Sequence, residues 1–77
     1  MVIDLIVTAS DDGYTAEVPS LKECESWAHT EDEVIEKVLE LVRYYTNLPE
    51  ENEILVDRAR KQKNKTIFKL VFDKDKK

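Results

Sequence analysis

A single amphipathic helix, set among short alternating segments, constrains the fold of this chain most. Thr30 is a good N-cap, and Glu33, three residues later, completes a capping box. Three acidic residues fill the first turn, where the helix dipole favours negative charge. Apolar side chains then recur at helical spacing at Val34, Ile35, Val38, Leu39, Leu41, Val42 and Tyr45. We therefore expect a helix that starts after Thr30, is stopped by Asn47 and Pro49, and buries one broad face.

Segments with a period of two precede this helix. Residues 2–9 alternate so that every second side chain is apolar and lies on one face. A turn follows in which Gly13 can supply a positive φ angle, and residues 14–18 alternate as a returning antiparallel strand. A third short strand is expected at residues 24–28, with its small side chains inside and Trp27 on the opposite face.

The segment after the helix allows two interpretations. Residues 50–65 could form a loop with a short helix, or residues 54–60 could form a strand that turns at Lys63-Asn64. The strand is the preferred interpretation. Residues 66–73 alternate more clearly and predict a further strand, which places on one face Phe68, Leu70 and Phe72.

These elements predict one α+β domain over residues 1–77, with a frayed tail at residues 74–77. The order is β-β-β-α-β(β), in two layers: an antiparallel sheet of four to five strands with one helix on one face. The single cysteine excludes an internal disulfide, so self-association is the easiest source of extra stability for so small a core.

One helix covers only one face of such a sheet. If the strands neighbour one another, the other face carries Ile6, Trp27, Ile67 and Val71. An apolar patch on so small a domain usually marks an interface. We therefore predict these four residues as a surface for a partner or for self-association.

Charge divides the chain into two parts. Residues 1–53 carry 14 acidic and 3 basic residues, a net of −11, while residues 54–77 carry 3 and 9, a net of +6; together they give −5. An acidic body repels phosphate, which disfavours independent binding to a nucleic-acid duplex, and a basic partner is its natural complement. A solvated acidic surface that aids solubility is the simpler alternative.

The basic stretch is the best signal for nucleic acid. Five bases fall within residues 58–65: Arg58, Arg60, Lys61, Lys63 and Lys65. They could follow a phosphate backbone, which makes a small nucleic-acid-binding domain the alternative function. They could equally form a solvated hairpin whose charge balances the acidic helix.

No catalytic constellation is expected. Cys24 and His29 lie five residues apart on one predicted strand and therefore point to opposite faces. A lone cysteine and a lone histidine do not make a zinc site, and a single glycine does not make a phosphate-binding loop. We expect no enzyme, metal or cofactor; a degenerate nuclease-like hydrolase holding Mg²⁺ through acidic residues is the remaining alternative.

The expected cellular location of the protein follows from two kinds of segment that the sequence lacks. No stretch approaches the roughly 20 apolar residues of a membrane span, and the first residues do not resemble a signal peptide. A free cysteine fits a reducing compartment. We expect a cytoplasmic protein with no membrane partner.

Residues 12–21, Asp-Gly-Tyr-Thr-Ala-Glu-Val-Pro-Ser-Leu, resemble the HicB-like antitoxin family. The likeness continues through Cys24 to the capped helix start at residues 30–33, and it covers roughly residues 2–46. The chain departs from the family at Lys22-Glu23, where members usually carry Pro-Gly, and in the β-branched residues that replace helix alanines.

The resemblance implies a β-β-β-α-β domain that neutralises a small basic HicA-like ribonuclease toxin by occluding its active site. It also implies a stand-alone domain without the DNA-binding module that many such antitoxins carry, acting as a homo-oligomer. We therefore expect a protein-binding, antitoxin-like domain, which either has a toxin partner or is an orphan that once had one.

Overall fold

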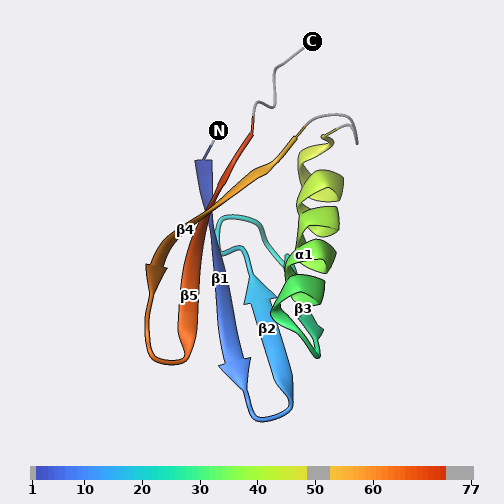
Figure 1. The fold of residues 1–77 in the computed structure, drawn as a ribbon. Helices are drawn as coiled ribbons and strands as arrows, with labels where there is room; N and C mark the ends of the chain where they lie inside the picture. The colour runs from blue at the N-terminus through green and yellow to red at the C-terminus, as the bar shows by residue number, and fades with distance from the viewer. Residues whose placement is uncertain (1, 49–52, 73–77) are drawn as a thin grey trace.

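Within the residues that the structure describes, the chain forms one helix and five strands, in the predicted order (Figure 1). The computed structural model describes residues 2–48 and 53–72. The elements are β1 (Val2–Ser10), β2 (Gly13–Glu17), β3 (Glu25–Ala28), α1 (Glu31–Thr46), β4 (Leu55–Lys61) and β5 (Lys65–Val71). The α+β class is therefore confirmed. Three expectations, on Pro49, on residues 50–52 and on the tail at 74–77, fall outside the described residues.

The five strands form one antiparallel sheet in the order β3-β2-β1-β5-β4. The last strand, β5, returns to lie beside the first, so that β1 is the central strand. Its residue Ile6 lies opposite Glu17 on β2 and opposite Ile67 on β5. The preferred interpretation of the segment after the helix is confirmed, because β4 and β5 form a hairpin that turns between Lys61 and Lys65.

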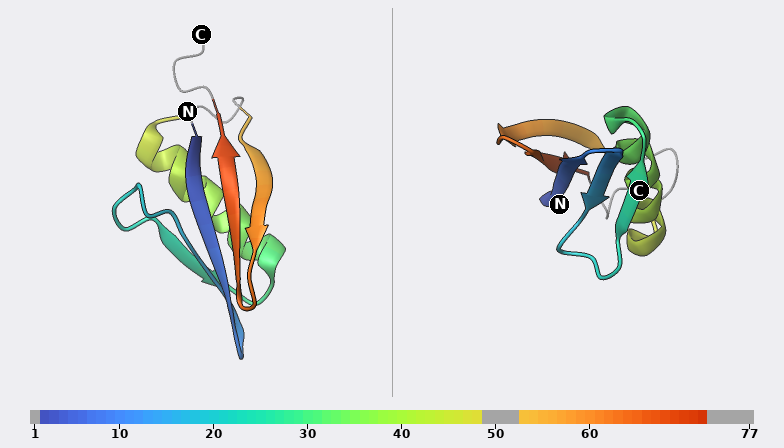
Figure 2. Two further views of the ribbon diagram at one scale, coloured as in Figure 1. Left: turned by 90° about the vertical axis from the view of Figure 1, so that its left-hand side faces the viewer. Right: turned by 90° about the horizontal axis from the view of Figure 1, so that it is seen from below.

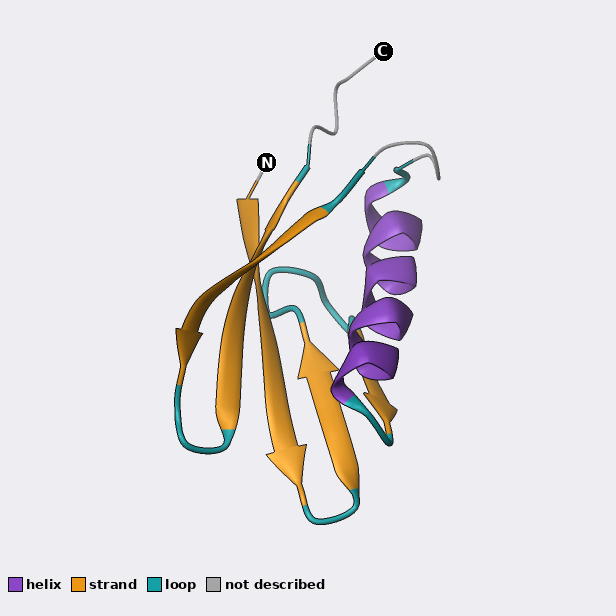
Figure 3. Cartoon of the chain, viewed as in Figure 1, coloured by secondary structure: helices purple, strands orange, loops and turns teal. Residues whose placement is uncertain are grey.

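The helix lies on one face of the sheet and packs against β2 and β3 (Figures 2 and 3). The core fills the space between these two layers. Its most deeply buried large side chains come from both layers: Leu5, Val7, Val18, Val34, Val38, Val42 and Leu70. The turn of the β4–β5 hairpin lies on the other side of β1 from the helix (Figure 1), and all seven residues of β4 are exposed.

Both ends of α1 are capped as the sequence predicts. The backbone N–H of Glu33 donates to Oγ1 of Thr30 over 3.2 Å, and the same hydroxyl donates to Oε1 of Glu33 over 3.1 Å. Asn47 takes the left-handed conformation, with φ 59° and ψ 37°, and its N–H donates to the carbonyl of Tyr44. Asparagine tolerates this conformation better than most residues, which explains why the helix ends here.

The expected apolar stripe is wrong at Tyr45. Its side chain is 44% exposed and packs edge to face on Tyr44, with ring centroids 5.4 Å apart. The buried row instead follows a spacing of four residues from Val34 to Thr46, which is 3% exposed. Thr46 tolerates burial because its hydroxyl donates to the carbonyl of Val42 over 2.6 Å.

The expected role of Gly13 is also wrong. No described glycine has a positive φ. A Cβ at Gly13 would lie 2.6 Å from the carbonyl oxygen of Ala28 and 2.6 Å from Cζ2 of Trp27. Glycine is needed here because the neighbouring strand and the indole of Trp27 approach the backbone closely.

The loop between β2 and β3 contains a strained residue, Glu23, with φ 61°. This is the position at which the family resembled by the sequence usually carries glycine, the residue that adopts such angles freely. Backbone hydrogen bonds hold the loop: Val18 N–H donates to the carbonyl of Cys24 over 2.9 Å, and Cys24 N–H to that of Leu21 over 3.3 Å. The loop keeps a glycine-like conformation without glycine.

Candidate protein interface

The sheet face opposite the helix has an apolar centre. Ile6 and Ile67 lie directly opposite each other on β1 and β5, and both are half-buried. Leu5 and Phe68, the neighbouring pair, are buried on the helix side, so alternation places the isoleucine pair on the open side. The structure therefore brings together two of the four predicted interface residues in adjacent strands.

A second apolar group lies at one end of the same face. Val71 is opposite Val2 on β1 and opposite Leu55 on β4. Val2 is 59% exposed and Leu55 is 56% exposed, so these two residues extend the predicted surface. Neither residue could be predicted for this surface from the sequence, because their place beside Val71 depends on strand neighbours that alternation alone does not reveal.

Trp27 lies apart from this surface. Its strand, β3, is at the edge of the sheet, with β2 between it and β1. The indole packs edge to face on His29, with ring centroids 4.7 Å apart, and lies against the backbone of Gly13. Trp27 is 42% exposed. It is a separate exposed aromatic residue, not part of one patch with the isoleucine pair.

Charged residues flank the isoleucine pair in its own row across the sheet and also occupy the next row. The row through this pair reads Glu25, Glu17, Ile6, Ile67 and Arg60, from β3 to β4. In the next row Lys69 donates to Asp4 over 2.5 Å, and both side chains are about half exposed. In the row of the isoleucine pair the face is thus acidic towards β3, apolar at its centre and basic at Arg60 on β4, while the next row ends on β4 with an acidic residue, Asp57, opposite Lys69.

The same separation of charge holds for the whole molecule. Residues 13–46, which include β2, β3 and α1, carry eight acidic and three basic residues, a net of −5. Residues 55–71, which form the β4–β5 hairpin, carry one acidic and six basic residues, a net of +5. The fold places these two parts on opposite sides of β1.

The outer surface of α1 carries a shallow hollow of about 220 Å³. Lys37 lines it together with three acidic residues, Glu33, Glu36 and Glu40.

A β-bulge divides the basic residues of the hairpin between two faces. The register shifts between Arg58, opposite Phe68, and Arg60, opposite Ile67, so Ala59 is an extra residue. Arg58 lies on the helix side, with its guanidinium carbon 5.9 Å from the ring centroid of Phe68. Arg60 faces the open side. The predicted basic segment is therefore not one continuous track.

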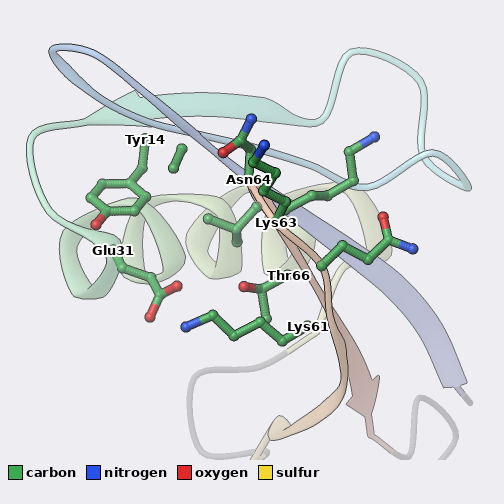
Figure 4. Close-up of a pocket in the computed structure, with 10 residues that line it drawn as sticks. Tyr14, Glu31, Lys61, Lys63, Asn64 and Thr66 are labelled. Atoms are coloured by element: carbon green, nitrogen blue, oxygen red, sulfur yellow. The ribbon is translucent and has the colours of Figure 1, made fainter.

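Three of the five predicted bases meet at a cavity of about 240 Å³ (Figure 4). Lys61, Lys63 and Lys65 line it from the hairpin, and Lys61 reaches toward Glu31 at the start of α1. Tyr14 closes the opposite side. The cavity therefore joins the basic hairpin to the acidic helix N-terminus across the end of β1 and β2.

Cys24 and His29 are kept apart, as the alternation predicts. Cys24 is buried, and burial raises the pKa of its thiol above the ordinary value. His29 is exposed and contacts Trp27. A buried neutral thiol is a poor nucleophile, so Cys24 acts here as a small core residue.

Within the described residues, no group of three or more histidine, cysteine or acidic side chains could hold a metal ion. In the same part of the chain, no helix is both long enough and apolar enough to cross a membrane. No protein-family model, curated protein or solved structure matches the chain.

Proposed function

We propose that this chain is a protein-binding domain of the HicB-like antitoxin type. It neutralises, or once neutralised, a small basic HicA-like ribonuclease toxin by occluding its active site, and it acts as a homo-oligomer in the cytoplasm. It is not an enzyme. The observation that carries the proposal is the separation of charge, which gives β2, β3 and α1 a net of −5 on one side of the molecule.

The outer surface of α1 is the part that meets the toxin. Glu36 and Glu40 are exposed one helical turn apart, beside the hollow that Lys37 shares with them. Carboxylates spaced in this way attract the lysines and arginines of a basic protein and speed its approach. The fold, with three strands before one helix and two strands after it, contains the β-β-β-α-β order that the resemblance implies and adds one strand to it.

The test is to co-express the chain with the product of the neighbouring reading frame. A complex that co-purifies, and growth restored when that product is toxic, would support the proposal. The double reversal Glu36→Lys and Glu40→Lys should weaken the complex at least tenfold, which is about 1.4 kcal/mol. Lys63→Glu, a reversal on the β4–β5 hairpin outside α1, is the control and should bind at least as well as the unchanged chain.

Absence of a complex together with absence of growth rescue would refute the antitoxin proposal. Undiminished binding by the Glu36→Lys, Glu40→Lys variant would leave a toxin partner but remove α1 as its docking surface. The first result tests whether the chain binds a toxin, and the second tests whether α1 is the surface that binds it.

The second candidate is nucleic-acid binding through the β4–β5 hairpin. It is favoured by the six basic residues between positions 55 and 71, which face solvent on both sides of the bulge. Contacts to phosphate are strongest at low salt, so a filter-binding titration there is the most sensitive test. Lack of affinity for single-stranded and double-stranded RNA and DNA under those conditions would exclude this function.

A further inference from the structure

We infer that the open sheet face binds a second copy of this chain about a two-fold axis that runs parallel to the strands, between β1 and β5. This deepens the homo-oligomer of the proposed function, and such a dimer forms whether or not a toxin exists. It leaves α1 outward on each copy, because the helix lies on the opposite face of the sheet.

The row through Ile6 is complementary to itself. When one copy is turned over onto another about the stated axis, β1 meets β5 of the second copy and β2 meets β4. Ile6 then lies opposite Ile67 of the second copy, and Glu17 lies opposite Arg60 of the second copy. Each contact occurs twice, as in any two-fold interface.

The neighbouring rows obey the same rule. Asp4 meets Lys69 of the second copy, and Val2 meets Val71 of the second copy, because each pair lies directly opposite on β1 and β5. Acidic groups therefore meet basic groups in the rows of Ile6 and Asp4, and apolar groups meet apolar groups in the rows of Ile6 and Val2. Asp57, beside Lys69 on β4, lies beyond the last paired residue of β2 and meets no strand of the second copy. An axis running across the strands would place Glu17 near Glu17 of the second copy and is disfavoured by charge repulsion.

The size of the face limits the strength of the dimer. Four strands spaced about 4.8 Å apart, each contributing about seven residues of 3.3 Å, span roughly 450 Å² of projected area per copy. Stable complexes usually bury about 800 Å² per partner. The expected dimer is therefore reversible and concentration-dependent, and it weakens as salt screens the Glu17–Arg60 contacts.

Sedimentation velocity of the full chain from micromolar to millimolar concentration tests the inference. We expect the unchanged chain to shift from monomer to dimer over this range, and Ile67→Glu to remain monomeric. Because Ile67 is half-buried, circular dichroism must show that this variant folds. Two variants at exposed sites, Glu17→Lys and Arg60→Glu, avoid that difficulty. In a dimer of either variant with itself, like charges would face each other at both symmetric contacts. Each variant should therefore be monomeric when it is alone.

Mixing these two variants gives the sharpest result. In a heterodimer the introduced lysine faces the introduced glutamate, and the remaining Glu17 faces the remaining Arg60. We therefore expect the mixture to dimerise while neither variant does so alone. The matched controls Glu36→Lys and Lys63→Glu carry the same charge changes outside the face and should dimerise like the unchanged chain.

A monomer at every concentration, a dimer that persists in Ile67→Glu, or a mixture that stays monomeric would each overturn the inference. None of these outcomes bears on toxin binding, which is tested by the reversals on α1. Conversely, a failed toxin test leaves the dimer prediction intact.

Discussion

Replacing Gly13 with alanine tests a close approach between β2 and β3. The new Cβ would lie 2.6 Å from the carbonyl oxygen of Ala28 and 2.6 Å from Cζ2 of Trp27. The indole can turn away, but the carbonyl belongs to the β3 backbone and can move only if β2 and β3 separate locally. Overpacking of this kind costs roughly 1–3 kcal/mol, and the backbone contact places Gly13→Ala at about 2–3 kcal/mol.

The effect is large enough for a simple assay. For a domain of this size, 1 kcal/mol shifts the melting temperature by roughly 4–8 °C, so Gly13→Ala should melt roughly 8–24 °C lower. Circular dichroism at low micromolar concentration keeps self-association from contributing. Thr15→Ala, an exposed change on the same strand, is the control and should cost less than about 1 kcal/mol.

A second substitution separates the two contacts. Trp27→Ala in the Gly13→Ala background removes the contact with the ring but leaves the contact with the Ala28 carbonyl. It should therefore not restore the stability of the unchanged chain. If Gly13→Ala melts within about 4 °C of the unchanged chain, the close approach does not constrain the fold, and the reasoning is refuted.

Three further perturbations follow from local geometry. Glu23→Gly should raise the free energy of unfolding by about 0.5–1 kcal/mol in urea titrations, because it relieves a left-handed conformation; a loss of stability would contradict this. Thr30→Ala should lower stability by about 1 kcal/mol and Thr30→Ser much less, since the hydroxyl caps α1; equal losses would exclude the cap. Burial raises the pKa of Cys24, so the neutral thiol stabilises the fold fully below the ordinary thiol pKa, and this contribution falls as the pH rises through the higher folded value. Iodoacetamide should accordingly label folded Cys24 more slowly than the urea-unfolded chain at the same pH, and equal rates would count against its burial.

The local elements could be predicted from the sequence because their signals are local. The Thr30 cap, the Asn47 stop and the alternation around Phe68 each depend on residues within one or two turns of chain. The same local signals favoured the β4–β5 hairpin over the alternative interpretation, a loop with a short helix. The one error in the helix, at Tyr45, arose because both Tyr45 and Thr46 lie near the edge of the stripe, and the burial of Thr46 depends on a hydroxyl bond that hydrophobicity does not register.

The interface could be predicted only in part, because it depends on which strands are neighbours. Alternation correctly assigned Ile6 and Ile67 to the face away from the helix, yet it gave no information that β5 pairs with β1. That pairing joins the two isoleucines, whereas β2 lies between Ile6 on β1 and Trp27 on β3. The role of Gly13 was hidden for the same reason, since its crowding comes from Trp27 and Ala28 on a neighbouring strand.

The extra residue at Ala59 has a consequence for how copies of this chain can accumulate. It shifts the alternation of β4, so that Arg58 presents positive charge on one side of the free edge and Arg60 on the other. A foreign strand approaching that edge would meet an interrupted ladder between two layers of cations. Sideways extension of the sheet at the β4 edge, the kind of growth by which exposed strands form fibrils, is thereby obstructed.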